Sequence, residues 1–341
     1  MVPVTVCYYQ SRFNHNGQHG LVLCCPFFLP HLSLCYIINN NCSKFMKVEQ
    51  IKIDKKNKIP VYLFGTEPKI LLMAGVHGDE KTGVVILQKI IKQLQNNKKS
   101  YPVAIIPCVN LPAYQANSRV NPKDQIDLNR IFPVVKIKSQ SYQIAKAIQN
   151  FAEKFTLVID IHVFTGQYTL MCGVELNTKK DKLNKKVRRI MSQLGMEAIC
   201  RMDHASEPKK DGSLCAYLQS KNMLAFGIEL PPLEVLTKNN SKKIINNLIT
   251  LVKNSHKKTK IKKLQSYTRL HVFSEHTGIF SPKKIPGINL KKGDIVGILK
   301  EKNTKTLAVS SPFDGKLISV SYKKFVKKGD KIFVVGKRVI G

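Results

Sequence analysis

Two histidines and one glutamate follow apolar runs of the sequence, and their types and spacing suit a metal ion. The run ILLMAG leads directly into VHGDE, so His77 and Glu80 lie three residues apart just before a helical pattern. A second run, LVIDIH, ends on His162. Imidazole nitrogens and carboxylate oxygens are good zinc ligands, and a catalytic zinc site combines three protein ligands with a position for water. These three residues are therefore candidate ligands for one metal ion.

Several other polar residues accompany this pattern. Asp160 lies two residues before His162, on the same side of the predicted strand, where it can orient the site. The segments SRVNPKDQIDLNRIFP and FGIELPP add further candidates: Arg119, Asn129, Arg130 and Glu229. Taken one at a time, such residues are usually structural, as a hydrogen-bonded histidine, a solvated arginine or a glutamate in a salt bridge. Their occurrence together favours a site over chance.

Apolar runs alternate with helical patterns along the middle of the chain. Five runs are typical of strands: residues 61–64, 70–74, 103–107, 157–161 and 224–228. Two segments carry apolar side chains at the three-and-four spacing of helices: residues 82–94 and 142–151. This alternation predicts an α/β fold with a mixed, largely parallel sheet covered by helices on both faces. In such sheets the ligand crevice lies beyond the carboxyl ends of the strands, where the candidate residues stand.

The first 45 residues differ from the rest of the chain. They contain no Asp or Glu, and their apolar stretch over residues 21–38 is interrupted by Pro26 and Pro30. A signal peptide or membrane anchor is one interpretation, but the stretch is short for a span and no small-residue cleavage site follows. We favour the other interpretation, in which residues 1–45 are an extension outside the working protein and Met46 is its start.

A second change in composition follows the basic run HKKTKIKK at residues 256–263. Short β-rich runs punctuated by Gly and Pro then predict a small all-β module over residues 263–341, after a catalytic domain over residues 46–262. Two similar phrases, LKKGDIVGIL and VKKGDKIFVV, suggest an internally repeated barrel-sandwich that resembles the biotinyl/lipoyl-like modules. No lysine stands in an MKM-type setting, so we expect a structural or substrate-capping module.

The formal net charge of +34 raises the question of a polyanionic partner. The lysines are spread along the chain, and no RNP, zinc-finger or helix-turn-helix pattern accompanies them, so we expect neither a nucleic-acid nor a membrane partner. A positive field would instead draw small anions toward a cleft. Five of the nine cysteines lie before residue 46, and the other four form no CxxC pair. This favours a reducing compartment, and hence a cytoplasmic location.

The phrases HGDE, DLNRIFP, DIH and IELP, in this order, resemble the succinylglutamate desuccinylase/aspartoacylase family, which is related to the zinc carboxypeptidases. The resemblance spans most of residues 46–341 and includes the small β module. It implies zinc ligation by His77, Glu80 and His162, and it implies these further roles: Arg119 polarising the scissile carbonyl, Asn129 and Arg130 holding a substrate carboxylate, and Glu229 acting as general base. Asp127 is expected to brace its loop, and His204 to be an ordinary surface residue.

The resulting expectation is zinc-dependent hydrolysis of an amide in a carboxylate-bearing substrate, most simply deacylation of an N-acyl amino acid. A metallocarboxypeptidase acting on a peptide or cell-wall peptide is the alternative, because it would use the same metal, base and arginines. An alternative of another class is a non-catalytic protein that binds anions or nucleic acid. The expected partner is a small anionic N-acyl amino acid or short peptide, and the oligomeric state stays open.

Overall fold

The computed structural model describes residues 46–97, 101–176, 181–202, 212–253, 264–301 and 306–339. The helices are α1 (Lys81–Gln95), α2 (Leu111–Gln115), the 3-10 turn η1 (Leu128–Arg130), α3 (Gln140–Ala152), α4 (Asp181–Gln193), α6 (Leu214–Ser220) and α7 (Lys238–Lys253). The strands of the first part are β1 (Met46–Lys52), β2 (Lys58–Phe64), β3 (Ile70–Ala74), β4 (Val103–Ile106), β5 (Leu157–Val163), β6 (Gln167–Thr169), β7 (Cys172–Leu176), β8 (Ala198–Met202) and β9 (Leu224–Leu230). Those of the last part are β10 (Ser266–Phe273), β11 (Gly278–Pro282), β12 (Asn289–Leu290), β13 (Ile295–Lys300), β14 (Thr306–Ser310), β15 (Gly315–Ser321), β16 (Phe325–Val326) and β17 (Lys331–Arg338).

The centre of the main sheet is parallel. Strands β4, β3, β5 and β9 lie side by side in this order, and each neighbouring pair is parallel. Every residue of β3 and β5 is buried, which is the pattern of strands covered on both faces. Antiparallel strands β1 and β2 extend one side of this centre, and β7 joins the other side antiparallel to β9. The mixed α/β sheet expected from the sequence is therefore confirmed.

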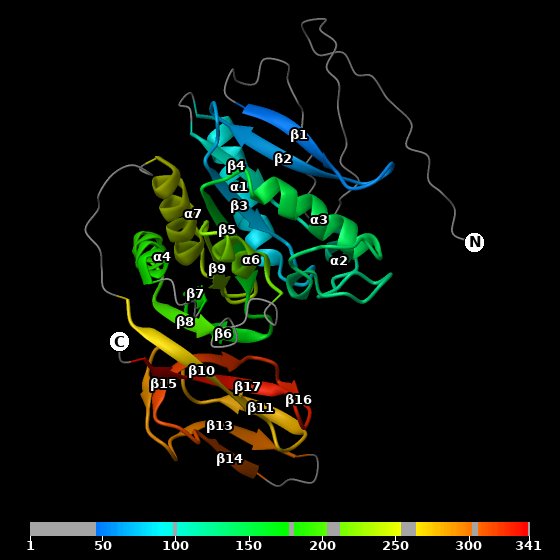
Figure 1. Ribbon diagram of the computed structural model, residues 1–341. Helices are drawn as coiled ribbons and strands as arrows, with labels where there is room; N and C mark the ends of the chain where they lie inside the picture. The colour runs from blue at the N-terminus through cyan, green and yellow to red at the C-terminus, as the bar shows by residue number, and fades with distance from the viewer. Residues whose placement is uncertain are drawn as a thin grey trace, which may run out of the picture.

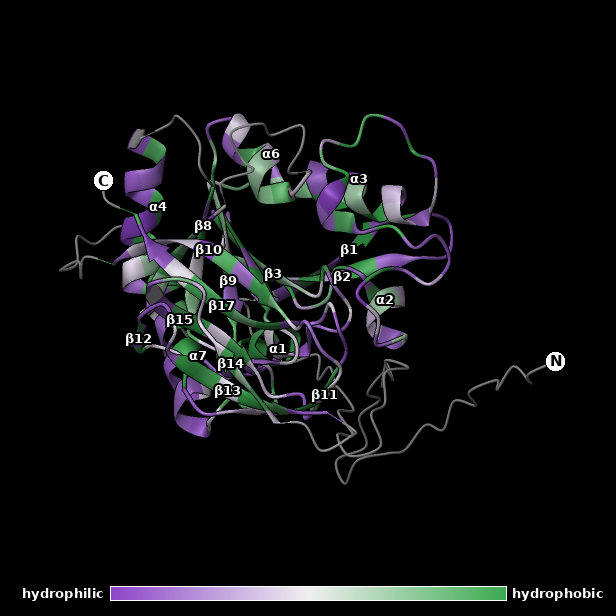
Figure 2. Cartoon of the chain, turned by 90° about the horizontal axis from the view of Figure 1, so that it is seen from below, coloured by the Kyte–Doolittle hydropathy of each residue, from purple (hydrophilic) through white to green (hydrophobic). Residues whose placement is uncertain are grey.

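Helices cover both faces of this sheet (Figure 1). The buried side chains of α1, α4 and α7 pack with one face, and those of α3 and α6 pack with the other. Helix α1 shows the reason, because its buried residues Val84, Leu87, Ile91 and Leu94 recur every three or four positions. Seen from below in Figure 2, the strands are largely green and α4 is largely purple, as expected for a surface helix.

The sheet does not stop where the predicted β module begins. Strand β10 pairs in parallel with β8, and β17, β15 and β12 continue the same sheet. A second sheet has the order β14-β13-β11-β16 and packs below it in Figure 1. The predicted boundary at residue 262 and the basic run beside it lie outside the described residues, as do residues 1–45. The division into residues 46–262 and 263–341 therefore stays a prediction.

The two repeated phrases form the same turn. In each, a two-residue strand is followed by a Lys-Lys-Gly-Asp turn and a long strand, β12 to β13 and β16 to β17. The aspartate carboxylate accepts a hydrogen bond from the first lysine's backbone N–H, at 3.0 Å for Asp294 and 2.9 Å for Asp330. The glycines have φ of +92° at Gly293 and +88° at Gly329, a region that favours glycine.

Asp124 ties the polar loop before η1 to helix α3. Its carboxylate accepts hydrogen bonds from the Ser139 hydroxyl and from the Ser141 hydroxyl and backbone N–H, so it caps the helix from a distance. Replacing Asp124 by Ala is expected to lower the free energy of unfolding by about 1 kcal/mol, the usual cost of a lost cap. Chemical denaturation at pH 7 measures this change.

The pH dependence of this effect has a defined sign. Burial alone would raise the pKa of Asp124, but the hydrogen bonds from Ser139 and Ser141 outweigh it and lower the pKa. The stabilisation is therefore present above the ordinary carboxyl pKa and is lost as the pH falls through the lowered value. An equal difference between wild type and Asp124→Ala at pH 7 and at pH 2 would contradict this account.

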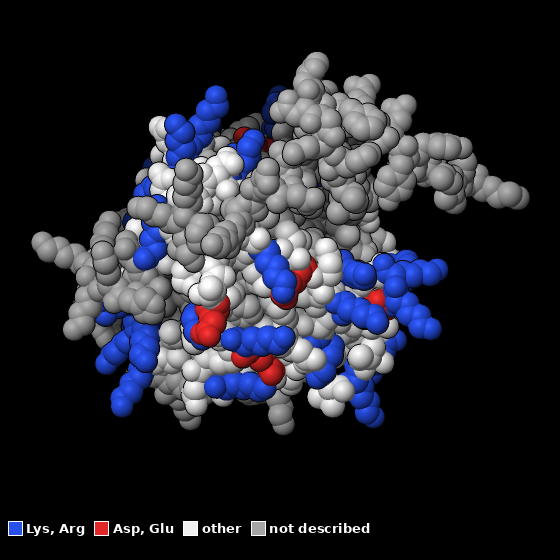
Figure 3. Space-filling model, turned by 90° about the horizontal axis from the view of Figure 1, so that it is seen from above, with Lys and Arg blue, Asp and Glu red and all other residues white. Residues whose placement is uncertain are grey.

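Basic side chains are dispersed over the surface. Figure 3 shows Lys and Arg scattered across the described part of one face, with single Asp and Glu side chains beside several of them. This dispersal agrees with the even spread of lysines in the sequence. Within the described ranges, every helix is too short or too polar to cross a membrane.

Candidate metal centre and its cavity

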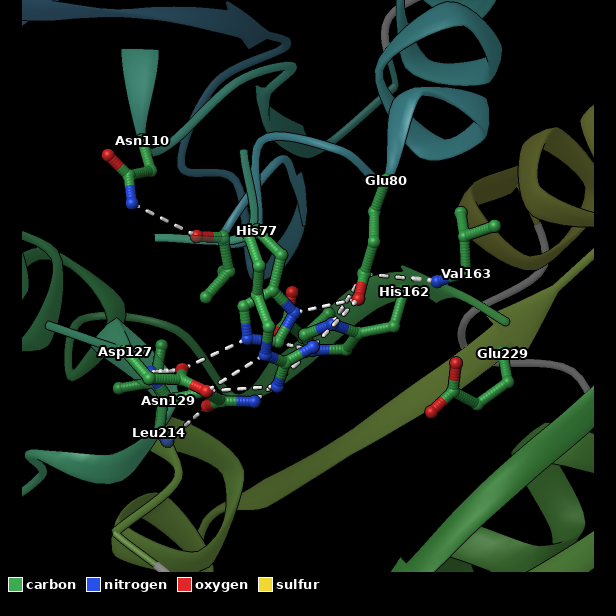
Figure 4. Close-up of polar contacts among 12 residues, drawn as sticks. His77, Glu80, Asn110, Asp127, Asn129, His162, Val163, Leu214 and Glu229 are labelled. Carbon is green, nitrogen blue, oxygen red and sulfur yellow. Dashed lines mark hydrogen bonds and ion pairs between the residues drawn. The ribbon is translucent and has the colours of Figure 1, made fainter. Parts of the chain in front are cut away.

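Three side chains from two elements converge at the carboxyl edge of the parallel strands. His77 and Glu80 lie in the turn between β3 and α1, and His162 is the sixth residue of β5. One ligand atom from each of these residues lies within 4.8 Å of the others. His77 Nδ1 is 2.7 Å from one Glu80 carboxylate oxygen, and His162 Nδ1 is 2.9 Å from the other (Figure 4). All three residues are buried, so the cluster suits an ion rather than solvated charges.

The local fold explains why these residues meet. Gly78 lies against helix α2, and a Cβ there would be 2.0 Å from the carbonyl carbon of Ala113, so the turn tolerates no side chain at this position. Glu80 is the residue that precedes helix α1. Its carboxylate also accepts a hydrogen bond of 3.1 Å from the backbone N–H of Val163, which fixes it against the end of β5.

In each histidine, the ring nitrogen Nε2 contacts a further carboxylate. His77 Nε2 lies 3.0 Å from Asp127, and His162 Nε2 lies 2.9 Å from Asp160, as the sequence analysis anticipated for Asp160. A carboxylate at Nε2 keeps that nitrogen protonated and leaves Nδ1 to face a metal, which is the usual arrangement around metal-bound histidines. Two imidazole nitrogens and one carboxylate oxygen on such supports fit a divalent metal ion.

The charged groups of the cluster shift one another's pKa values. Burial alone would raise the pKa of Glu80, but His162 and His77 outweigh it and lower the pKa to about 2. Burial would likewise lower the pKa of His162, whereas the charges of Asp160 and Glu80 raise it well above its ordinary value. Glu80 is therefore ionised at neutral pH, as a metal ligand must be.

Asp127 connects the metal cluster to Arg119. It is the N-cap residue that precedes η1, and its second oxygen accepts hydrogen bonds from Arg119 Nη2 at 2.9 Å and Arg119 Nε at 3.2 Å. Arg119 Nη1 in turn lies 3.6 Å from the Glu80 carboxylate. Asp127 thus braces its loop, as expected, and also orients both a histidine and an arginine.

Replacing Asp127 by Asn is expected to weaken metal binding by about 10–100-fold, because an amide cannot hold the His77 ring and Arg119 as a carboxylate does. Competition with a chromophoric zinc chelator measures the affinity. Asp314→Asn, at an exposed aspartate of the last part of the chain, is the matched control and should leave the affinity unchanged. Equal zinc affinities for Asp127→Asn and wild type would show that Asp127 is no more than a loop brace.

Asn129 and Arg130 lie beside the cluster on η1. The Asn129 amide nitrogen is 3.4 Å from His162 Nε2, and its oxygen accepts a hydrogen bond of 3.2 Å from the backbone N–H of Leu214 at the start of α6. Arg130 is exposed and donates from Nη1 to the carbonyl of Asn129 at 2.7 Å. Both residues line the same cavity as the cluster, but their role toward a substrate stays a prediction.

Glu229 lies on β9, the strand next to β5, which carries His162, and it lines the same cavity. The two residues are register partners in the parallel pair β5 and β9. Figure 4 places Glu229 on one side of the cluster, and Asp127 and Asn129 on the other. Burial raises the pKa of Glu229 above its ordinary value, even though His162 lowers it. A carboxylate with a raised pKa beside a metal cluster is a suitable proton acceptor and donor.

The sequence analysis expected a structural or substrate-capping module in the last part of the chain but named none of its residues at this cavity. The cavity has a volume of about 270 Å³ and is lined by all seven candidate residues together with Arg269, His271 and Lys331. Arg269 Nη1 lies 3.9 Å from the Glu229 carboxylate. A basic residue in an alternating strand such as YTRLHVF is usually solvent-facing, so the sequence carried no signal for this placement. His204, in contrast, lies outside the described residues.

Comparison with known proteins agrees with the site. The family model of the succinylglutamate desuccinylase/aspartoacylase catalytic domain matches residues 66–254. An N-alpha-acetyl-L-2,4-diaminobutyric acid deacetylase from Halomonas elongata is 42% identical over 69 residues, which make up 20% of this chain and 20% of the deacetylase. The chain thus aligns with about a fifth of that relative's length.

Two solved structures share the fold over nearly the whole described chain. A succinylglutamate desuccinylase from Silicibacter sp. TM1040 has a TM-score of 0.70 and 20% identity, and the match covers 83% of this chain and 89% of that one. A product-bound ectoine utilization protein from Ruegeria pomeroyi has a TM-score of 0.69 and 20% identity, with 82% and 89% covered. The family model contains both the His77–Glu80 turn and the His162 strand end and covers more than half of the chain, so the chain belongs to the succinylglutamate desuccinylase/aspartoacylase family.

Proposed function

We propose that this protein is a zinc-dependent deacylase that hydrolyses the amide bond of a carboxylate-bearing N-acyl amino acid. The observation that carries the proposal is the convergence of a buried two-histidine, one-carboxylate cluster with Glu229 and two arginines around one cavity. Imidazole and carboxylate ligands of this number are typical of catalytic zinc sites. Membership of the family supports the same reaction.

Each residue of the site has its own role in hydrolysis. A zinc ion held by His77, Glu80 and His162 would supply a Lewis acid and make water acidic enough to react near neutral pH. Glu229 accepts a proton from the attacking water as the new C–O bond forms. It then delivers that proton to the amide nitrogen as the C–N bond breaks, so the products are a carboxylate and an amine.

Two arginines bind the negatively charged groups of the substrate. Arg119, oriented by Asp127, donates hydrogen bonds toward the oxyanion that develops on the carbonyl oxygen. One well-placed donor of this kind lowers the activation barrier by about 3 kcal/mol. Arg130 presents a planar fork that matches a carboxylate in two hydrogen bonds, and Asn129 lies beside it. Removal of an acyl group from an amino acid thus uses every polar group of the cavity that the sequence singled out.

The size of the cavity favours a deacylase over a carboxypeptidase. A volume of about 270 Å³ is at the small end of ligand sites, which range over about 300–1,000 Å³. Strands β10 and β17 supply part of its wall, where a peptide chain would need an open groove. The Halomonas relative is named for the deacetylation of an N-acetyl amino acid, which supports the same choice. The free cysteines among the described residues, Cys108, Cys172, Cys200 and Cys215, support a cytoplasmic location.

The test combines metal analysis with a substrate panel. We expect about one zinc ion per chain by mass spectrometry, because the site offers one set of three ligands. The holoenzyme should release amino acid from N-acyl amino acids faster than it cleaves dipeptides. Faster cleavage of dipeptides would point to the carboxypeptidase, and zinc binding without turnover of either class would leave only a metal-binding member of the fold.

A further inference from the structure

A groove lies between helices α1 and α7, apart from the metal cavity. The two helices contact one another on the same face of the main sheet (Figure 1), and the loop between β9 and α7 forms part of the groove wall. The groove has a volume of about 650 Å³, within the range of about 300–1,000 Å³ found for ligand sites. Among the described residues, none lines both this groove and the metal cavity. The proposed deacylase function therefore leaves the groove unused.

The floor of the groove is apolar. Side chains of both helices and of the loop between β9 and α7 form it: Val85, Ile86, Leu233, Leu236 and Ile245. Leu233 is exposed, and Val85 and Leu236 are half-buried, so apolar surface in a concave part of the molecule stays open to water. Apolar surface that gathers in one groove and has a polar rim is typical of an interaction site, unlike single exposed apolar side chains.

The rims of the groove are basic. Lys89 and Lys92 stand one turn apart on α1, and Lys238 and Lys242 stand one turn apart on α7. All four lysines are exposed, and the described residues that line the groove include no Asp or Glu. Four like charges therefore border an apolar floor without a counter-charge in the lining. This arrangement favours an occupant that is both apolar and anionic.

Hydrogen bonds hold the wall of the groove in place. The Thr82 hydroxyl, in the first turn of α1, donates a buried hydrogen bond of 3.0 Å to the carbonyl of Pro231. The backbone N–H of Leu236 donates to the carbonyl of Pro232, also at 3.0 Å. These bonds fix the loop that carries Leu233 and Leu236 against α1. The groove is thus preformed, and a preformed groove costs a partner little reorganisation on binding.

The length of the groove and the placement of its charges indicate the kind of occupant. On α1 the lining residues extend from Val85 to Asn96, which is about 16 Å, or three turns of an α-helix. A molecule with a single anionic group would engage only one or two of the four lysines. An amphipathic helix lays its apolar side chains on such a floor and brings flanking side chains to both rims. We propose that the groove between α1 and α7 binds an acidic amphipathic helix of a partner protein.

Other occupants match the groove less well. Residues 1–45 of this chain contain no Asp or Glu, so they bring no counter-charge. A second copy carries the same formal charge of +34, which disfavours association through a basic groove. A membrane surface would have to reach apolar side chains at the bottom of a concave site, whereas interfacial helices insert their apolar face into the lipid. Charge and shape together therefore favour an acidic helix.

A display library of random peptides, selected against the full chain, tests the proposal. Peptides of about 16 residues allow four helical turns, one more than the groove accommodates. We expect the enriched peptides to combine Asp or Glu with apolar residues at the three-and-four spacing of a helix. Fluorescence anisotropy of the synthesised peptides then gives their dissociation constants. These constants should rise with salt concentration, because exposed charges at the rims contribute to binding.

Two pairs of variants locate the binding site of these peptides. Lys242→Glu should weaken binding by about fivefold, because a repulsion replaces an attraction at the rim. Lys243→Glu makes the same charge change at the next residue of α7, outside the groove lining, and should leave the affinity nearly unchanged. Leu233→Ser should also weaken binding by about fivefold through loss of apolar contact. Ile295→Ser, at an exposed isoleucine of β13, is its control.

Several results would overturn the proposal. They are the absence of enriched peptides, enriched peptides without acidic residues, and equal effects of Lys242→Glu and Lys243→Glu. If no acidic helical peptide is enriched, but the chain binds vesicles of phosphatidylserine and phosphatidylcholine and Lys242→Glu weakens that binding, the groove is a site for a lipid surface instead. All of these measurements are independent of turnover, so their failure leaves the deacylase function untouched.

Discussion

Replacing Glu229 by Gln is expected to lower kcat by about 10²–10⁴-fold, the usual contribution of a general base, while about one zinc ion per chain is retained. The amide keeps the size of the side chain but accepts no proton from water. Glu229 is outside the ligand cluster, so its loss leaves His77, Glu80 and His162 in place. Steady-state kinetics on the preferred N-acyl amino acid, with zinc measured on the same sample, tests both parts.

The pH profile adds a second readout for Glu229. Burial raises the pKa of this carboxyl group, and the base is active only when ionised. Activity of the wild type should therefore fall as the pH drops through a value above that of an ordinary glutamate, and this acidic limb should be absent from the residual activity of Glu229→Gln. Glu234→Gln, an exposed glutamate five residues downstream, is the control and should behave like wild type. Turnover indifferent to Glu229→Gln would place the base elsewhere.

The parallel centre of the sheet could be predicted because its strands are buried on both faces. Such strands read as continuous apolar runs, and the prediction of residues 70–74 coincides with β3. The same burial made the metal cluster visible, because a histidine or glutamate at the end of an apolar run is conspicuous. To predict that His77, Glu80 and His162 lie together, the only long-range rule required was that parallel strands end at the same edge of a sheet.

Other elements gave weaker signals. Helix α4 is rich in lysine and arginine. Only its few apolar residues indicate which face of the helix packs on β7. Strands β7 and β8 each contain a charged residue, Glu175 and Arg201, so neither forms a continuous apolar run. The pairing of β8 with β10 joins residues 67 positions apart in the sequence, and no local pattern encodes such a partner.

This pairing explains why no residue of β10 or β17 was named as a site candidate. The sequence analysis expected a structural or substrate-capping module in the last part of the chain, whereas β10 and β17 continue the main sheet. Arg269 and Lys331 thereby reach the cavity that His162 and Glu229 define. The metal cluster comes from local sequence motifs, whereas these cations come from distant strands.

Removal of one metal ligand should abolish activity through loss of the metal. Glu80→Gln replaces the anionic ligand, and zinc affinity should fall by more than the about 10–100-fold expected for a supporting residue such as Asp160 in Asp160→Asn. The two histidines explain the size of the effect. Both Nδ1 atoms face the Glu80 carboxylate, so a neutral amide there leaves the ion with two neutral imidazoles and no anionic ligand among the three.

Comparing Glu80→Gln with Asp160→Asn distinguishes a residue that binds the metal from one that only orients a metal ligand. Asp160→Asn should regain activity in excess zinc, because the three ligands remain, whereas Glu80→Gln should stay inactive at any zinc concentration that the protein tolerates. Chelation of the wild type should remove activity, and added zinc should restore it. Zinc titrations followed by activity and by metal content give both curves. Full activity of Glu80→Gln at substoichiometric zinc would mean that the cluster at the edge of β3 and β5 is a structural charge network, with the reacting centre elsewhere in the cavity.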